Sequence, residues 1–291
     1  MSEVPIGRGL LDRDVTDRMV NRATNAGLLA LQRITDEGET ILRKIIESRS
    51  AQDRVGMIVA SHLFVHFLTE LDGTEVLLSR ACTYAAKSTL RAMIESSAYT
   101  HWILKEDSDD RATRYYVGHC RSQLRIAKKE LDMASTEDSE FWKDAIQEAR
   151  TAISSPSLAE TNALFDQETR RDREPAWYSV AGGPKYMKQL MDQAGMDKRL
   201  GWFWERFSDF THGATYSLHT WMDSKKLMID PIRDPRGLHR DTRMAMHLAL
   251  QMYELICRKW LPSHLAHLKR RARRWSNDVK SMTPLDLHPL Q

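Results

Sequence analysis

The chain has 291 residues, of which 42% are hydrophobic and 29% are charged, with a formal net charge of +3. These values are typical of a soluble globular protein and exclude low-complexity, disordered and fibrous classes. The three cysteines, Cys82, Cys120 and Cys257, are far apart and form no Cys-x-x-Cys pair. We therefore expect neither a disulfide framework nor a thiolate zinc site, and a reducing cytoplasm as the location.

Membrane insertion and secretion are not expected from the sequence. Residues 1–15 contain no apolar stretch of the secretory type. The most apolar segment, residues 55–71, is 17 residues long and contains His62, His66 and Glu70. A membrane-spanning helix needs about 20 predominantly apolar residues, so we expect this segment to be a core helix.

Apolar residues recur at three- and four-residue spacing along nearly the whole chain, and no run of five or more residues alternates as a strand would. Helices are expected from Asp12 or Asp14 to about residue 48, and then at residues 54–81, 84–105, 110–134 and 137–153. Residues 154–176 are polar, with a proline near each end, which indicates a long connection or insertion that can include a turn of helix at 158–165. Further helices are expected at residues 186–194, 198–212 and 238–260.

This pattern predicts an all-α fold, a single-domain bundle of about seven to nine helices with an elaborated C-terminal half. Residues 1–50 would form an N-terminal helix packed on the bundle. Residues 51–260 would form the helical core, with a polar insertion near 154–176, and residues 261–291 a basic C-terminal tail. No linker separates two halves with independent cores.

Basic residues are concentrated near the C-terminus. Between residues 258 and 280 the chain has eight basic residues and one acidic residue. Such a stripe can contact the phosphate backbone of RNA or an acidic protein partner, whereas the simpler alternative is a solvated helix end. The residues predicted to contact nucleic acid are Lys269, Arg270, Arg271, Arg273 and Arg274.

Metal, cofactor and nucleophile motifs are not found. His62, His66 and Glu70 share one helical face, but no Glu directly follows the first His, as the zinc-protease pattern requires. The Glu-x-x-His units of di-iron bundles do not occur. His264 and His267 lie among basic residues, which disfavours a cation. Since phosphate-loop, dinucleotide and Gly-x-Ser-x-Gly motifs do not occur either, we predict no metal and no cofactor.

Two polar pairs stand on otherwise apolar helices. Arg91 and Glu95 are four residues apart, as are Ser208 and His212. If the helix at 84–105 packs on the helix at 198–212, these four side chains would form one buried polar cluster. A histidine in aromatic surroundings can transfer protons near neutral pH. The alternatives are a surface ion pair and a core histidine with satisfied hydrogen bonds.

The order of several short motifs resembles a widespread bacterial helical family of unknown function. The motifs are Arg91-x-x-x-Glu95, Arg114-Tyr115-Tyr116, Trp177-Tyr178-Ser179 with Gly182-Gly183, and Trp204-x-x-Phe207-Ser208-x-x-Thr211-His212-Gly213. The resemblance spans about residues 50–260, and Trp204 and Phe207 stand where that family usually has Tyr and Leu. It implies an all-helical fold and no known reaction.

The spacing of Arg206 and His212 also resembles the Arg-x(4–6)-His motif of the HEPN ribonucleases. That resemblance implies a homodimer with a shared site that cuts RNA without a metal. The 2′-hydroxyl would attack the adjacent phosphate, His212 would move protons, and Arg206 or Arg91 would stabilise the phosphorane charge. Glu95 and Ser208 would orient these groups. The same spacing occurs at four other histidines, and Arg206 is not expected in the unknown-function family.

Three functions follow from these patterns. The first is a HEPN-like, metal-independent endoribonuclease in phage defence or a toxin system. The second is a non-catalytic binding or scaffold protein whose basic tail docks nucleic acid or an acidic partner. The third is a small-molecule pocket lined by tryptophans near residues 202–204.

Overall fold

The computed structural model describes residues 13–47, 55–170, 173–211, 220–223, 226–229 and 232–282. These residues are almost entirely helical, which confirms the predicted all-α, multi-helix fold. The α-helices are α1 (Arg13–Glu47), α2 (Val55–Ser79), α3 (Thr83–Lys105), α4 (Ser108–Met133), α5 (Ser139–Ile153), α6 (Ala159–Glu168), α7 (Met187–Ala194), α8 (Lys198–Thr211), α9 (Leu238–Trp260) and α10 (Leu265–Lys280). Two short 3₁₀ helices, η1 (Trp177–Gly182) and η3 (Pro262–His264), complete the helical elements in the described residues.

Three elements differ from the sequence-based expectation. The polar segment expected as a connection contains the ten-residue helix α6. Strands β1 (Thr220–Asp223) and β2 (Lys226–Ile229) form an antiparallel hairpin that pairs Thr220 with Ile229. These strands have four residues each, which is too short for a period-two pattern to be recognised in the sequence. The residues after 261, expected as a tail, form η3 and the helix α10.

The chain packs as two compact units, each built from separate stretches of sequence. The first unit comprises Met1–Ser50, Phe64–Ser97 and Arg199–Gln291, and the second comprises Ala51–Leu63 and Ala98–Lys198. Helices α2 and α3 contribute residues to both units. Each unit is described separately below.

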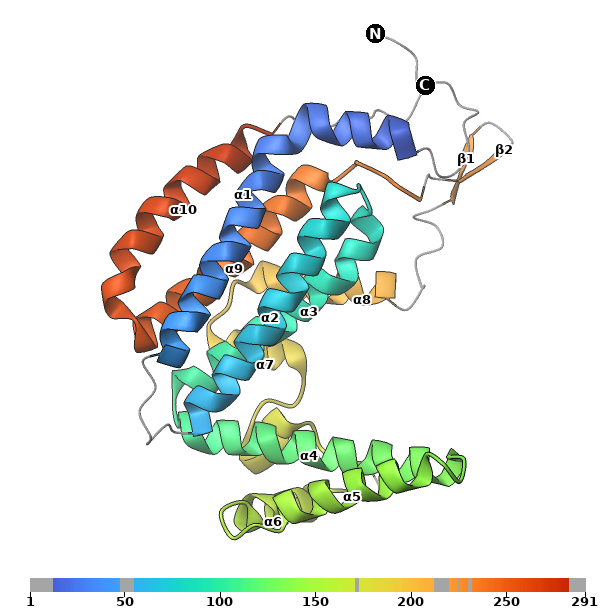
Figure 1. Ribbon diagram of the computed structural model, residues 1–291, viewed down its shortest axis with the longest axis vertical. Helices are drawn as coiled ribbons and strands as arrows, with labels where there is room; N and C mark the ends of the chain where they lie inside the picture. The colour runs from blue at the N-terminus through green and yellow to red at the C-terminus, as the bar shows by residue number, and fades with distance from the viewer. Residues whose placement is uncertain are drawn as a thin grey trace. The chain divides into compact units, whose positions relative to one another are not determined.

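In the first unit, α1, α9 and α10 pack side by side (Figure 1). Gly38 allows a close approach of these helices, because a Cβ atom there would lie 2.3 Å from Leu68 Cδ2 and 2.3 Å from the hydroxyl of Tyr253. The Tyr253 hydroxyl donates a hydrogen bond of 2.8 Å to the carbonyl of Ile34, and its ring meets Phe64 edge-on at 5.7 Å. Helices α1, α2 and α9 therefore share one tightly packed core.

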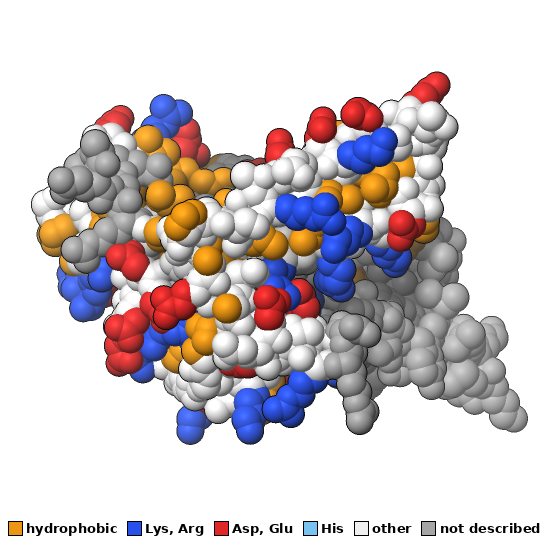
Figure 2. Space-filling view, turned by 90° about the horizontal axis from the view of Figure 1, so that it is seen from below, with side chains coloured by type: hydrophobic (Ala, Val, Ile, Leu, Met, Phe, Trp, Pro, Cys, Tyr) orange, Lys and Arg blue, Asp and Glu red, His pale blue; other side chains and the backbone are white. Residues whose placement is uncertain are grey.

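In the second unit, α4 packs against α5, α6 and η1. Val117, Phe165 and Val180 form the centre of its apolar core. Arg121 fixes the segment after α5, because its guanidinium donates hydrogen bonds to Asn162, Asp166 and Glu174 at 2.7–2.8 Å. The face shown in Figure 2 carries both basic and acidic side chains.

Helix α2 is predominantly apolar. Among the helices in the described residues, it is the one that by length and composition could cross a membrane, with a mean hydropathy of 1.2 over its most apolar window and 44% of that window buried. Its side chains also form protein core, since Phe64, Phe67 and Leu71 are completely buried. A buried core helix has the same composition as a membrane span. The sequence-based expectation of a core helix stays a prediction.

Candidate functional site

Helices α3 and α8 bring three of the predicted site residues together in the first unit. Arg91 Nε donates a hydrogen bond of 3.0 Å to Ser208 Oγ, and Arg91 Nη2 lies 2.9 Å from Glu95 Oε1. Trp204 closes the group, since its indole N–H donates to Glu95 Oε1 at 2.7 Å and its ring lies 5.1 Å from the Arg91 guanidinium. Arg91, Glu95, Trp204 and Ser208 are called the α3–α8 cluster below.

The α3–α8 cluster satisfies its own hydrogen bonds. The guanidinium of Arg91 is engaged by a carboxylate, a hydroxyl and an aromatic face, and Ser208 donates onward to the carbonyl of Trp204 at 3.0 Å. About a quarter of the Arg91 and Glu95 side chains is exposed. Charge-assisted hydrogen bonds of this kind fix side-chain geometry. The cluster therefore positions α8 on α3, and Arg91 has little freedom to bind a second anion.

A cavity of about 650 Å³ lies beside α8. It is formed by the start of α3, the outer face of α8, the loop before α9 and the first turn of α9. Its walls combine aromatic rings with charged side chains. The lining residues are Thr83, Tyr84, Lys87, Trp202, Phe203, Glu205, Arg206, Phe207, Asp209, Phe210, Asp234, Arg236, Gly237 and Arg240.

Arg206 lines this cavity and is not part of the α3–α8 cluster. Two positions along a helix of 3.6 residues per turn correspond to a rotation of about 200°, so Arg206 and Ser208 point to different sides of α8. The Arg206 guanidinium is 3.9 Å from Asp209 and 5.9 Å from the ring centre of Phe210. His212 follows Thr211, the last residue of α8, and lies outside the described residues.

The floor of the cavity holds a buried ion pair that the sequence analysis did not single out. Lys87 Nζ donates to Asp241 Oδ2, and the side chains of these residues are 4% and 0% exposed. Burial lowers the pKa of the Lys87 ammonium, and the neighbouring Asp241 carboxylate offsets part of this effect. Lys87 also lies 5.4 Å from the ring centre of Phe207. A buried ion pair therefore lies under the aromatic wall.

Two further arginines of the cavity are held by buried carboxylates. Arg236 Nε donates to both oxygens of Asp234 at 2.9 and 2.7 Å, and Asp234 is 2% exposed. Arg240 Nε donates to Asp241 Oδ1 at 3.1 Å. A carboxylate that binds one edge of a guanidinium leaves its other N–H groups directed elsewhere. The arginines are thus oriented before any ligand arrives.

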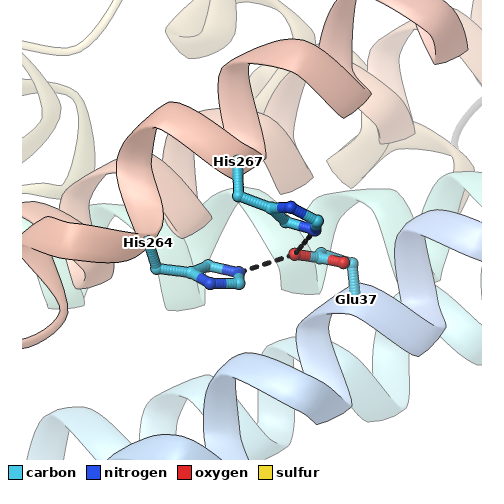
Figure 3. A group of neighbouring side chains, drawn as sticks. All are labelled: Glu37, His264 and His267. Carbon is cyan, nitrogen blue, oxygen red and sulfur yellow. Dashed lines mark hydrogen bonds and ion pairs between the residues drawn. The ribbon is translucent and has the colours of Figure 1, made fainter.

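A second polar group joins α1 to the start of α10 (Figure 3). His264 and His267 both face the carboxylate of Glu37, with Nε2 atoms 2.7 and 4.0 Å from Glu37 Oε1. Among the described residues, these three form a group whose potential metal-ligand atoms lie within 4.8 Å of one another. Glu37 is completely buried and His264 is 9% exposed at its side chain.

The hydrogen bonds around this group fit an ion-pair network better than a metal centre. Lys44 Nζ lies 3.1 Å from His264 Nδ1, and Arg271 Nη1 donates to Glu37 Oε2. With Lys44 as donor to Nδ1, the proton of His264 is on Nε2 and points at Glu37. A metal would need that Nε2 lone pair and would add charge beside two cations.

The predicted nucleic-acid-binding residues divide between two roles on α10. The buried face of this helix includes Leu268, Trp275 and Val279. Arg271 contacts Glu37 and lies over the ring of Trp275 at 5.2 Å, so it serves the packing of α10. The other four basic side chains are exposed on the outer face. They are Lys269, Arg270, Arg273 and Arg274.

The remaining motif residues contact one another in the second unit. The rings of Tyr115 and Trp177 meet edge-on at 5.1 Å, and Tyr99 packs against Trp177 at 5.3 Å. Arg114 Nη1 donates to the carbonyl of Val180 at 2.9 Å. These contacts join α4 to η1, so the motif residues of this unit serve to hold these two elements together.

The sequence contains a feature from which the buried pair of Lys87 and Asp241 could have been predicted. Lys87, Leu90 and Ile94 lie at i, i+3 and i+7, so the lysine occupies a position on an apolar helix face. A charge on such a face requires a buried partner. Asp241 lies in the first turn of α9, where the helix dipole by itself favours an acid. Its presence there therefore gives no indication that it pairs with Lys87.

Comparison with known proteins identifies the family. The sequence model of a family described as a family of unknown function (DUF5677) matches residues 57–226. This range contains every motif of the first resemblance. Neither the curated proteins nor the solved structures include a significant match. Because the matched segment covers more than half of the chain, and the expected helical fold is present, the protein belongs to this family of unknown function (DUF5677).

Proposed function

We propose that the protein is a metal-independent endoribonuclease of HEPN-like type. One observation carries the proposal. Arg206, the arginine of the Arg206–His212 spacing, lines a cavity that also holds Lys87, Arg236 and Arg240. A site for phosphoryl transfer without a metal needs cations that are already oriented toward the developing negative charge. Buried carboxylates orient three of these four side chains.

In this proposal, Arg206 stabilises the phosphorane and His212 moves the protons. The 2′-hydroxyl of the substrate attacks the adjacent phosphorus, the bond to the 5′-oxygen breaks, and a 2′,3′-cyclic phosphate and a 5′-hydroxyl end result. Arg206 is favoured over Arg91 because the Arg91 guanidinium is engaged by Glu95 and Ser208. Arg91, Glu95 and Ser208 are then positioning residues that orient α8.

A variant panel tests the proposal. Purified protein is incubated with total RNA in excess chelator, as wild type, Arg206→Ala and Arg43→Ala. Arg43 is a matched control, because it is an arginine on a helix surface with its own ion pair to Glu39 and lies outside the cavity. We expect Arg206→Ala to lower the rate of cleavage at least 100-fold, the size of a lost oxyanion donor, and Arg43→Ala to cleave as wild type. Equal cleavage by all three proteins would contradict the role of Arg206.

We also propose that the enzyme acts as a homodimer in the cytoplasm. The support is the HEPN resemblance for the dimer and the free cysteines for a reducing compartment. Sedimentation equilibrium should give twice the chain mass of 33.7 kDa. A monomer at all concentrations would contradict the shared site.

A non-catalytic binding protein is the second candidate, and the outer face of α10 favours it. Four exposed basic side chains lie there within six residues, and the acidic residue nearest to them in sequence is Asp278. The test replaces Lys269, Arg270, Arg273 and Arg274 by Gln and measures binding to RNA and to a poly-glutamate peptide. A binding protein would lose affinity for one of these ligands and would leave RNA uncut.

A further inference from the structure

We infer that the cavity beside α8 holds one unpaired base of a single-stranded RNA, stacked on Trp202. This inference deepens the proposed function, because it names the form of RNA that the site accepts. It rests on the shape of the cavity, on its exposed aromatic wall and on the fixed cations at the same place.

The size of the cavity suits a single nucleotide unit. Sites for small organic molecules measure about 300–1,000 Å³, and this cavity measures about 650 Å³. The first turn of α9, the loop before it and two helices line it, and it is partly open to solvent. A double helix is too wide to enter a hollow of this size, whereas one extruded base fits.

The aromatic wall contains a tryptophan that is largely exposed. Trp202 is 58% exposed, since it points about 200° away from buried Leu200 of the same helix. Phe203 meets the Trp202 ring edge-on at 4.9 Å, so the tryptophan is held from one side and leaves a face open. Aromatic rings that carry a free face are the usual stacking platforms for bases of single strands.

The cations of the cavity lie within the same walls as the rings. Arg206 comes one helical turn after Trp202 on α8, and Arg240 comes from α9. Arg240 is 60% exposed at its side chain, and Asp241 holds only its Nε edge. A base on Trp202 would therefore place its own phosphate near two guanidinium groups.

Duplex RNA cannot use this arrangement. Its bases are stacked and paired inside the A-form helix, and side chains cannot reach their faces. The cavity should therefore distinguish single strands from duplexes by stacking. This preference should be independent of the basic outer face of α10, which attracts any phosphate backbone.

Fluorescence anisotropy with the full-length His212→Ala protein tests this inference, since that variant should leave the RNA intact. The probes are a fluorescein-labelled 12-mer of uridylate and a labelled RNA duplex of 12 base pairs. The variants are Trp202→Ala, Trp202→Phe and the control Phe141→Ala, an aromatic residue that is 65% exposed on α5.

We expect Trp202→Ala to weaken binding of the single strand about tenfold, within the range measured for one stacked base. Trp202→Phe should restore most of the affinity, Phe141→Ala should have no effect, and the duplex should bind weakly to every variant. Equal affinity of Trp202→Ala and wild type for the single strand would overturn the inference, as would equal affinity for single strand and duplex.

The same panel separates this inference from the proposed function. If wild-type protein does not cut RNA but the single strand binds through Trp202, the ribonuclease proposal fails and the stacking site stands. If wild-type protein cuts RNA and Trp202→Ala changes neither affinity nor KM, the stacking site fails and the ribonuclease proposal stands.

Discussion

The side chain of Lys87 shows how strongly one buried charge depends on its partner. Its ammonium is almost fully buried against Asp241, which is itself inaccessible. Removal of one member of such a pair leaves an uncompensated charge, which typically costs about 3–5 kcal/mol. We predict that Asp241→Ala destabilises the protein by this amount, measured by urea unfolding.

The double variant Lys87→Met with Asp241→Ala is the control for that prediction. Neither charge of the pair remains in this double variant. Its loss of unfolding free energy should therefore be smaller, by at least about 1 kcal/mol, than the sum of the losses of Lys87→Met and Asp241→Ala alone. Additive losses would contradict a coupled pair and would assign the effect of Asp241→Ala to the loss of its contact with Arg240.

Glu75 provides a prediction for pH dependence. Burial raises the pKa of its carboxyl, while the hydrogen bond of 3.0 Å from Gln32 lowers it in part. A carboxyl with a raised pKa in the folded state binds its proton more tightly there than in the unfolded chain. Its contribution to stability is therefore complete below pH 4.5 and is lost as the pH rises through the folded pKa.

Glu75→Gln should therefore raise the melting temperature at pH 7, because the amide keeps an oxygen for Gln32 and carries no charge. The gain should disappear at pH 4, where the wild-type carboxyl is protonated. Melting curves of both proteins from pH 4 to 8 measure this difference. A gain of equal size at every pH would show that the charge of Glu75 is not its cause.

At the scale of single residues, the sequence predicted that Arg91, Glu95 and Ser208 lie together, but it did not predict that Arg206 lies apart from them in the cavity. Spacing by four correctly indicated that Arg91 and Glu95 share a face. Spacing alone could not show that Ser208 faces Arg91 while Arg206 faces the cavity, because that depends on how α8 is rotated on α3. Tertiary packing fixes this rotation.

Glu37 links helix α1 to η3 and to helix α10. This buried carboxylate accepts hydrogen bonds from His264 and Arg271, and Lys44 completes the network through His264. We predict that Glu37→Ala destabilises the protein by about 3–5 kcal/mol and increases hydrogen exchange in α10. Glu39→Ala is the matched control, because Glu39 is 60% exposed and pairs only on the surface, where such pairs contribute about 0–1 kcal/mol. Similar losses for the two variants would contradict the role of Glu37.

Substitution by alanine should lower the stability of the protein at Gly38 of α1 and raise it at Gly73 of α2. Gly38→Ala would place a Cβ atom against the hydroxyl of Tyr253, which is buried and hydrogen-bonded and cannot move away. We expect a loss of about 1–3 kcal/mol. Gly73→Ala would meet only Thr89 Cγ2 at 3.7 Å and should gain up to about 1 kcal/mol from helix propensity. Thermal unfolding measures both, and a stabilised Gly38→Ala variant would contradict the packing of α1 on α9.

At the scale of elements, helical periodicity was sufficient for the long helices and for the shorter helices α5, α7 and α8, whereas the β1–β2 hairpin and α10 were not predicted. The bounds of α2, α3 and α9 lie within a few residues of those expected, because each has an apolar pattern of several turns. The hairpin of β1 and β2 offers four residues per strand, too few for a period-two pattern to be recognised. Helix α10 was expected as a tail because its basic residues dominate the sequence. Its apolar contacts, Leu268, Trp275 and Val279, are widely spaced.

For the whole molecule, family membership and fold could be predicted from the sequence, whereas the cavity could not. The cavity combines lining residues at the start of α3 with residues of α8 and the start of α9 that lie more than 100 residues further along the chain. Its charges come from residues that are unremarkable in sequence, such as Asp234 and Arg240. Only the folded chain brings them together around Arg206.

The most direct test of the central proposal is the chemistry of RNA cleavage in excess chelator, with His212→Ala alongside the wild type. We predict that wild-type protein cuts total RNA to fragments with 2′,3′-cyclic phosphate and 5′-hydroxyl ends. We also predict that a substrate with 2′-deoxyribose at the cleaved position is not cut, and that His212→Ala is inactive. Intact RNA with wild-type protein across several RNA pools, or the same cleavage by His212→Ala, would contradict the account.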